Sequence, residues 1–392
     1  MRSLRGIVVG VACALIALVA GLWLGGHPQS LPDPLRDAFV ESDRATQAEV
    51  IDTIQDNYYK PESEAKLKQA SLKGIVSSLN DPFSHYLSPQ ERQQFEDSVS
   101  GSFEGVGMTV EEDRRGLRVL NAFDRSPAKA AGIRKGDLIV GVNGRSLAGL
   151  NSELATARIK GKAGTRVRLR VVHAGAKQPR ELDVTRRRIE VPVASGRVVE
   201  RHGVKLGVVR LVSFSSGAHA LLRQQVEKVQ KRGAKGILLD LRGNGGGLLT
   251  EAVLVASIFI EDGRIVSVRG RHRPERVENA EGDAIAAKIP LVVLVDGGSA
   301  SASEIVTGAL RDRHRATVVG VHTFGKGLVQ EPVPLANGGV LDLTVANYYL
   351  PGGKTIAPKK GITPQVRARD NPRTRADEAL PKALDTLVAK TR

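Results

Sequence analysis

The chain has 392 residues, which is too long for one ordinary domain, so two or three domains are expected. Hydrophobic residues make up 41% and charged residues 26%, as in chains that fold into globular cores. The formal net charge is +16, but the basic residues are scattered, aromatic residues are only 4%, and no nucleic-acid motif accompanies them. We therefore expect no nucleic-acid partner. Attraction to an anionic membrane surface explains the positive charge better than nucleic-acid binding does.

Residues 1–30 are predicted to be a membrane anchor or signal segment. Arg2 and Arg5 precede an unbroken apolar run over residues 6–26, which suits a spanning helix of roughly 20 residues better than the roughly 7–15 of a cleaved signal. Arginines before the run predict a cytoplasmic N-terminus and an exported remainder, with an uncleaved anchor favoured over a cleaved signal. The single cysteine, Cys13, lies in this run, so the remainder has no disulfide and no cysteine metal site.

Residues 35–100 are predicted to be a helical N-terminal region. Apolar residues recur at helical spacing, as at Ile75 and Leu79, and prolines such as Pro61 and Pro82 divide the region into short helices. A further short helix is expected over residues 90–99.

From about residue 101 to residue 190 the pattern changes to short strands with glycine turns. Leu117–Leu120, Leu138–Val140 and Val167–Val171 alternate or cluster as strands do. The pair Asn143-Gly144 has the turn chemistry of a hairpin. We expect a β-rich domain here.

Residues 200–368 are predicted to be an α/β domain. The short apolar runs over residues 236–240 and 291–295 are typical of buried strands. Residues 248–260 and 301–311 are helical in composition. Residues 369–392 are interpreted as a basic C-terminal tail.

A glycine-rich loop, Asp240–Leu248, follows the first of these buried strands and leads into a helix. Such a loop exposes backbone N–H groups that suit an anion. A dinucleotide site is the rival interpretation, but Leu248 stands where the third glycine of that fingerprint should be, and a lone glycine-rich loop favours neither.

A serine cluster, Ser299–Glu304, follows the second buried strand, and Lys326 comes later between two glycines. A serine is a poor nucleophile without a base, and a lysine whose pKa is lowered by burial can serve as one. The sequence has no Gly-x-Ser-x-Gly elbow and no His-Glu-x-x-His motif. From these residues alone, a surface lysine is the better interpretation of Lys326.

Residues 101–190 resemble a PDZ domain. The matching blocks are Gly105–Gly107, Ser126–Ala128 and Gly136–Gly144. In that family, the glycine loop directs backbone N–H groups at a peptide's terminal carboxylate while the peptide adds as a strand to a sheet edge. The resemblance implies that Gly105, Val106, Gly107 and Met108 bind a peptide C-terminus.

Nearly all of residues 47–366 resembles the C-terminal processing, or tail-specific, peptidases, which are Ser/Lys serine proteases with a PDZ domain. Further blocks carry this resemblance: Tyr58-Tyr59, Lys73-Gly74, Leu79–Leu87, Asp240–Gly247, Ser299–Glu304, Thr323–Lys326, Tyr349–Gly353 and Gly361–Pro364. The implied fold is a helical N-terminal region and a PDZ-like domain before an α/β peptidase core of the crotonase/Clp-like ββα kind.

The resemblance implies that Ser301 is the nucleophile, that Lys326 is its base and that Gln330 orients the lysine amine. It places the oxyanion hole at the N–H of Ala302 with that of Gly246 or Gly247. Ser299 and Ser303 are expected to help cap the helix that begins near Ser301. Asp240 and Arg242 are expected to hold the glycine loop. Glu304 and Thr323 are expected to support the site from beside it.

Two positions depart from the family's pattern: Gly245 stands where many relatives carry proline, and Lys160 where they often carry arginine in a contact thought to link the PDZ domain to the active site. The expected function is a serine endopeptidase of the cell envelope, on the periplasmic side of the inner membrane, anchored or secreted. It would recognise free, apolar protein C-termini and cleave upstream. No cofactor or metal is expected, and residues 35–98 are a candidate homodimer interface. A catalytically inactive PDZ peptide-binding protein is the alternative.

Overall fold

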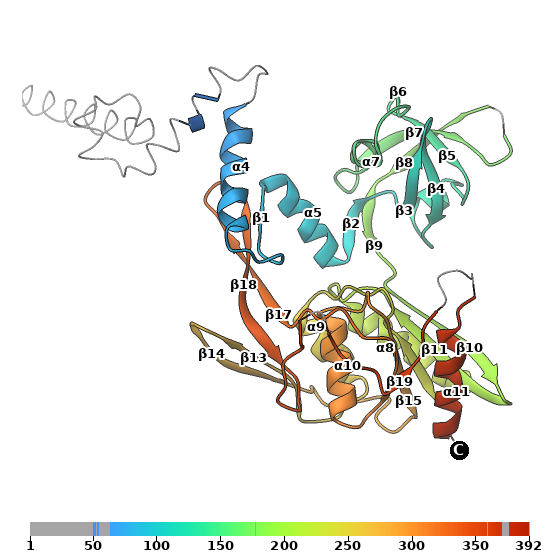
Figure 1. Ribbon diagram of the computed structural model, residues 1–392. Coiled ribbons are helices and arrows are strands. Elements are labelled where there is room, and N and C mark those ends of the chain that lie inside the picture. The colour runs from blue at the N-terminus through green and yellow to red at the C-terminus, as the bar shows by residue number, and fades with distance from the viewer. Residues whose placement is uncertain are drawn as a thin grey trace, which may run out of the picture. The chain divides into compact units, whose positions relative to one another are not determined.

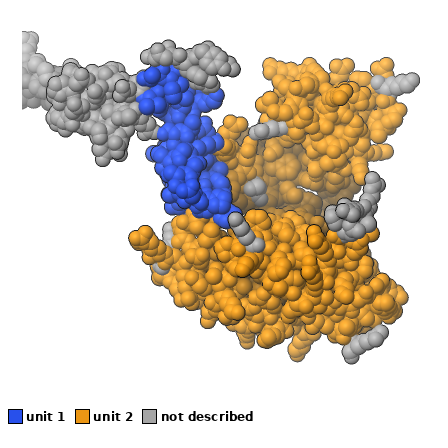
Figure 2. All heavy atoms as spheres, viewed as in Figure 1, with its two compact units in different colours: residues 1–88, 333–343 blue, residues 89–332, 344–392 orange. Residues whose placement is uncertain are grey.

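The computed structural model describes residues 50–51, 53–54, 63–176, 178–358, 360–370 and 376–391. The chain divides into two units, one of residues 1–88 with 333–343 and one of residues 89–332 with 344–392 (Figure 2). The predicted anchor, residues 1–30, lies outside the described residues. Within the described ranges, no helix combines the length and apolar character needed to cross a membrane.

The first unit contains helix α4 (Glu64–Ser77) and the short strand β1 (His85–Leu87), which pairs antiparallel with the start of strand β18 (Val340–Tyr349). Ser63 caps α4 by accepting a hydrogen bond from the Lys66 N–H at 3.3 Å. The sequence predicted helices throughout residues 35–100 and missed β1, because its three residues carry no periodic signal and its partner lies far along the chain.

The second unit begins with helix α5 (Pro89–Ser100), where the sequence predicted one, and continues into the PDZ-like module. This module is a sheet of order β3-β4-β5-β7-β8 with a short β6 beside β5 (Figure 1). Asn143 and Gly144 both have positive φ, 49° and 77°, and join β5 to β6 as the predicted tight hairpin turn. The strands are β3 (Met108–Asp113), β4 (Gly116–Ala122), β5 (Leu138–Val142), β6 (Arg145–Ser146), β7 (Arg166–Val172) and β8 (Arg180–Thr185).

Two helices complete this module. Helix α6 (Pro127–Ala130) begins with the expected proline and is capped by Ser126, whose Oγ accepts from the Lys129 N–H at 3.1 Å. Helix α7 (Ser152–Ile159) contacts β3 and β4. Among the strands that the structure describes, β3 pairs only with β4, so it is an edge strand of this sheet.

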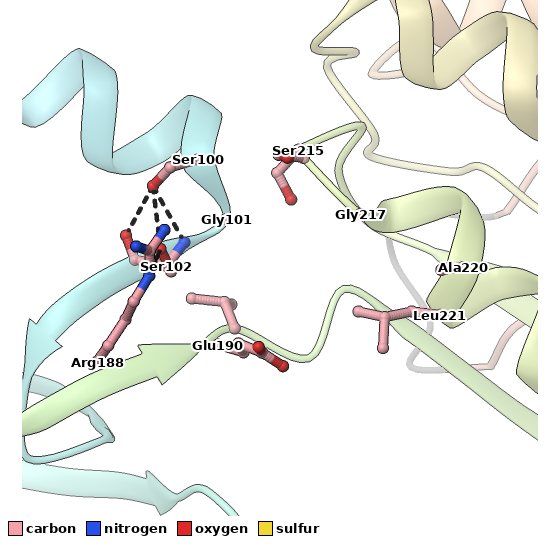
Figure 3. Close-up of a pocket in the computed structure, with 11 residues that line it drawn as sticks. Ser100, Gly101, Ser102, Arg188, Glu190, Ser215, Gly217, Ala220 and Leu221 are labelled. Carbon is pink, nitrogen blue, oxygen red and sulfur yellow. Dashed lines mark hydrogen bonds between the residues drawn. The ribbon is translucent and has the colours of Figure 1, made fainter.

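A two-stranded ribbon of β2 (Ser102–Gly105) and β9 (Arg187–Glu190) connects the PDZ-like module to the rest of the unit. Beyond the ribbon, the Val191 N–H donates to the Gly101 carbonyl, and the Ser216 N–H donates to the Val99 carbonyl. A cavity of about 390 Å³ lies at this junction (Figure 3). Its lining comes from α5, the ribbon, the loop before helix α8 (Ala218–Lys231) and the start of that helix: Ser100, Ser102, Arg188, Glu190, Ser215 and Leu221, among others.

The α/β core is a six-stranded sheet of order β10-β11-β12-β15-β16-β19, antiparallel only between β10 and β11. Its central strands are continuous apolar runs, as expected for strands covered on both faces. A second, smaller sheet joins β17, β18, β13 and β14. The strands are β10 (Ala194–Arg201), β11 (Val204–Leu211), β12 (Ile237–Asp240), β13 (Arg264–Gly270), β14 (Arg273–Asn279), β15 (Leu291–Val295), β16 (Thr317–Gly320), β17 (Leu328–Pro334) and β19 (Val366–Arg367).

Successive side chains of the central strands enter two different cores. Ile237 and Leu239 of β12 pack with helices α8 (Ala218–Lys231), α9 (Leu249–Ser257) and α10 (Ala302–Asp312). Leu238 points to the opposite face. Both predicted helices of this domain are present as α9 and α10.

Helix α11 (Ala379–Thr391) covers that opposite face, so the interpretation of residues 369–392 as a basic tail is wrong for most of their length (Figure 1). Its apolar residues recur at helical spacing and are buried: Ala383, Leu384, Leu387 and Val388. The lysines between them face outward, and for this reason the composition of the segment alone suggested a basic tail.

Candidate active site

Two loops meet at one edge of the core sheet. The glycine-rich loop follows β12 and the serine cluster follows β15, and these strands are parallel neighbours, so their carboxyl ends lie side by side. Ser301 stands at the start of α10, 7% exposed, with φ 53° and ψ −114°. A positive φ is costly for a residue with a side chain, and such strain is concentrated at functional sites.

The Glu304 carboxylate joins the serine cluster to the lysine loop. It is fully buried in the first turn of α10. Its Oε2 accepts from the Ser301 N–H at 2.9 Å and from the Lys326 N–H at 2.8 Å. Its Oε1 accepts from the Thr323 hydroxyl at 2.6 Å and the Gly325 N–H at 2.8 Å. Glu304 thus fixes the backbone of the two candidate catalytic residues, and Thr323 belongs to the same network.

The glycine loop packs directly on Ser301. A Cβ atom on Gly246, whose φ is +103°, would lie 2.9 Å from the Ser301 Cβ and 2.8 Å from the Ala300 carbonyl oxygen, so only glycine fits here. Ser299 and Ser303 do not cap the helix as expected. Their hydroxyls instead donate to the Leu241 and Asn244 carbonyls, both at 2.8 Å, and fasten the two loops together.

The two glycines that were considered for an oxyanion hole, Gly246 and Gly247, differ in whether their backbone N–H group already has an acceptor. The Gly246 N–H already donates to the Asn244 side chain at 3.0 Å. For the Gly247 and Ala302 N–H groups, no acceptor is recorded among the residues that the structure describes. Phe214 fixes the loop on both sides of Gly247. Its N–H donates to the Gly246 carbonyl, and its carbonyl accepts from the Leu248 N–H.

Lys326 and Gln330 lie beside strand β18. Lys326 is half-buried and lies two residues before the start of β17. Gln330 is on β17, and its Nε2 donates to the Thr344 hydroxyl of β18 at 3.1 Å. The structure therefore brings Ser301, Lys326 and the loop glycines to one region through Glu304, and it places Gln330 in contact with Thr344.

Arg242 secures the glycine loop from its other end, as the sequence predicted for Asp240 and Arg242. The guanidinium donates to both oxygens of Asp240, at 3.0 and 2.9 Å, and to both oxygens of Asp377, at 2.8 and 2.9 Å. Burial by itself would lower the pKa of Arg242, but these hydrogen bonds outweigh it and raise the pKa above its ordinary value. Asp377 leads into α11, so the C-terminal helix is tied to the loop.

The predicted carboxylate-binding loop lies at the start of the edge strand β3. Gly107 has φ +81°, and a Cβ there would lie 2.5 Å from the Ser126 Cβ. Val106 is buried in the core of the PDZ-like module, and Met108 packs partly exposed against that core. Gly105 ends β2, opposite Arg187 of β9.

Lys160 ends helix α7 and contacts the elements that lead out of the PDZ-like module. Its Nζ lies 3.7 Å from the Asp97 carboxylate of α5 and 5.5 Å from the centre of the Phe103 ring of β2. Gly245, the other departure, is exposed, and a Cβ there would meet nothing within 4 Å.

Sequence reasoning missed Thr344. It lies on strand β18, whose alternating pattern marks it as structural, and only the folded chain shows that its hydroxyl accepts a hydrogen bond from Gln330. Among the described residues, no group of three or more His, Cys, Asp and Glu side chains could hold a metal ion.

Comparison with known proteins agrees with this architecture. Residues 205–368 match the family model described as peptidase family S41, and residues 105–184 match a PDZ domain. The carboxy-terminal processing protease CtpA of Bacillus subtilis (strain 168) is 37% identical over 316 residues, which cover 80% of this chain and 66% of the relative. The carboxy-terminal-processing protease of Bartonella bacilliformis is 36% identical over 324 residues, covering 81% and 73%. Among solved structures, the photosystem II D1 C-terminal processing protease is 29% identical with a TM-score of 0.50, covering 88% and 97%.

A PDZ domain joined to this α/β core, together with relatives of this kind, defines a serine-type peptidase. The chain belongs to peptidase family S41 and, within it, to the carboxy-terminal processing peptidases.

The Glu304 network predicts the effect of Glu304→Gln. One carboxylate oxygen becomes an NH₂ group that faces two donors, and each buried donor left unpaired costs about 1–3 kcal/mol. We expect kcat on a protein substrate to fall by about two orders of magnitude. Glu227→Gln is the matched control, because Glu227 forms only a surface pair with Arg223. Near-normal kcat in Glu304→Gln would show that the carboxylate does not hold the site together.

Proposed function

We propose that this protein is an endopeptidase that binds free, apolar protein C-termini through its PDZ domain and cleaves upstream with a Ser301/Lys326 dyad. The observation that carries the proposal is the Glu304 carboxylate. One of its oxygens accepts from the backbone N–H groups of both Ser301 and Lys326, so two residues from distant loops are held at one point.

The proposed reaction begins when neutral Lys326 takes the proton of the Ser301 hydroxyl. The serine oxygen attacks the scissile carbonyl carbon, and the N–H groups of Ala302 and Gly247 donate to the resulting oxyanion. The Lys326 ammonium then gives its proton to the leaving amine. Water enters in the same way and hydrolyses the acyl-enzyme. Gln330 orients the lysine amine.

Recognition of the C-terminus is proposed for the start of β3. A peptide can add to β3, because the described sheet leaves one edge of this strand unpaired, and α7 lies next to it. The backbone of Gly105–Met108 would receive the terminal carboxylate, since charge-assisted hydrogen bonds are about twice as strong as neutral ones. Met108 would contact an apolar last side chain.

A position on the periplasmic side of the inner membrane is proposed from the sequence alone. The apolar run over residues 6–26 and the arginines before it support an exported, anchored enzyme.

The dyad predicts that Ser301→Ala and Lys326→Ala each abolish cleavage of a protein substrate while thermal unfolding stays unchanged. Removing a general base costs about 10²–10⁴-fold, and more where it acts as a unit with the nucleophile. In the wild type, activity should fall as the pH drops, because the protonated fraction of Lys326 grows and an ammonium cannot accept a proton. Normal turnover by Lys326→Ala, or a flat profile from weakly acid to alkaline pH, would refute the assignment.

C-terminal selection is tested with two copies of one protein substrate, one with a free apolar C-terminus and one amidated. The amidated copy should be cleaved much more slowly. Gly107→Pro should remove the difference, because proline deletes an N–H and cannot adopt the φ of +81° found here. A short peptide that does not reach the PDZ domain is the control and should be cleaved equally by both enzymes. Equal cleavage of both copies by the wild type would mean that the PDZ domain selects in another way.

Membrane attachment is tested by deleting residues 1–30. The truncated protein should fold, cleave substrate and remain in the supernatant at high salt, whereas the full chain should sediment with membranes. If the truncated protein still sediments at high salt, residues 6–26 are not the attachment.

A further inference from the structure

The junction cavity, between α5, the β2–β9 ribbon and the start of α8, is lined by none of the residues assigned to the reaction or to the carboxylate-binding loop. Its volume of about 390 Å³ falls within the range of small-molecule sites, about 300–1,000 Å³. Figure 3 shows Ser100 and Ser102 on one side of it and Ser215 and Leu221 on the other. The two sides touch at Gly101, where a Cβ atom would lie 2.5 Å from the Ser215 Oγ.

Ser215 brings an unused polar group to this cavity. The residue is 3% exposed, and among the residues that the structure describes no hydrogen bond is recorded for its hydroxyl. Buried polar groups normally have a hydrogen-bond partner, so an unpaired one in a cavity wall indicates a place for a polar atom of a ligand. A hydroxyl both donates and accepts, and it therefore suits either the N–H or the carbonyl of a peptide bond.

Two opposite charges line the cavity from strand β9. Arg188 and Glu190 are two residues apart, so they share one face of the strand, with Cα atoms about 7 Å apart. The Arg188 Nε donates to the Ser102 Oγ at 3.1 Å, although Glu104 is the cross-strand partner of Arg188. Within the described part of the chain, neither Arg188 nor Glu190 forms an ion pair. Each charge is therefore open to a ligand of opposite charge.

The remaining lining defines the class of ligand. Apolar side chains complete the wall: Val191, Ala220 and Leu221. A molecule that offers a carboxylate, an ammonium, a peptide group and an apolar side chain is a short peptide with both ends free. An extended chain spans up to about 3.3–3.6 Å per residue, so a dipeptide or tripeptide matches the spacing of the two charges.

We propose that the junction cavity binds a dipeptide or tripeptide with free ends and an apolar side chain, its carboxylate on Arg188 and its ammonium on Glu190. This binding does not require the proposed Ser301/Lys326 mechanism. The proposed function gives it a use, however, because trimming apolar C-termini releases short peptides of this kind. The site would then bind the product of the enzyme.

The cavity wall is connected to the glycine loop. Ser215 follows Phe214, which holds the loop on both sides of Gly247. Gly217, which also lines the cavity, donates its N–H to the Glu251 carboxylate of α9 at 2.8 Å, and α9 begins where the loop ends. A bound peptide would lie beside both supports of this loop, so the site is placed to make turnover respond to the peptide.

The experiment titrates the dipeptide Ala-Leu into the full-length protein by calorimetry. The protein carries Ser301→Ala, which prevents hydrolysis, and Gly107→Pro, which removes the proposed PDZ site for a carboxylate. We expect saturable binding at one site. Amidation of the dipeptide carboxylate and acetylation of its amine should each weaken binding about tenfold, because each removes one charge-assisted hydrogen bond.

Two substitutions in this background assign the ends of the peptide. With Arg188→Gln, amidation should cost nothing more, and with Glu190→Gln, acetylation should cost nothing more. Arg188→Lys keeps the charge and should keep the sensitivity to amidation. Arg180→Gln is the matched control, because this exposed arginine of β8 does not line the cavity, and it should bind Ala-Leu as the parent does. Thermal unfolding is measured for every variant.

The inference is overturned if Ala-Leu shows no saturable binding, or if acetylation of its amine leaves the affinity unchanged. It is also overturned if amidation costs as much with Arg188→Gln as without it, or acetylation as much with Glu190→Gln as without it. Failure of the proposed function is a separate outcome, which would appear as cleavage retained by Ser301→Ala or Lys326→Ala.

Discussion

The site depends on one buried carboxylate, that of Glu304. A charged group removed from water is tolerated only if hydrogen bonds replace its hydration, and Glu304 obtains four of them. All four donors come from the serine and lysine loops, so satisfying the carboxylate and assembling the two loops are the same event. Without one of these loops, the other would lack the hydrogen bonds that stabilise its conformation.

The backbone around Ser301 carries strain that this network and the glycine loop sustain. Ser301 has a positive φ, and Gly246 lies so close behind it that a methyl group would not fit. Such a conformation persists only where surrounding contacts over-determine it. Here they do so from two sides: Glu304 holds the Ser301 N–H, and the Ser299 and Ser303 hydroxyls hold the neighbouring turn to the glycine loop. Several buried polar side chains therefore surround Ser301, which is itself only 7% exposed.

Much of this could be predicted from the sequence, because the signals were local. Continuous apolar runs gave the buried strands over residues 236–240 and 291–295, and Asn143-Gly144 gave a hairpin turn. The motifs that resemble the peptidase family located the loops of the site. What could not be predicted depends on contacts between distant segments. Strand β1 exists only through pairing with β18. Helix α11 is basic in composition, and its buried face is apparent only in the folded chain. Thr344 is an ordinary strand residue until the fold brings Gln330 to its hydroxyl.

The ion cluster around Arg242 has a consequence for the order in which the enzyme is completed. Its guanidinium is shared between Asp240, at the entrance of the glycine loop, and Asp377, which precedes the last helix. Synthesis runs from the N-terminus to the C-terminus, so Asp377 and α11 are made well after the glycine loop and the serine cluster. Until they are made, Arg242 lacks the Asp377 carboxylate and one face of the central sheet lacks its cover. The loop beside Ser301 therefore has its full support only after α11 has been made and has packed on the sheet.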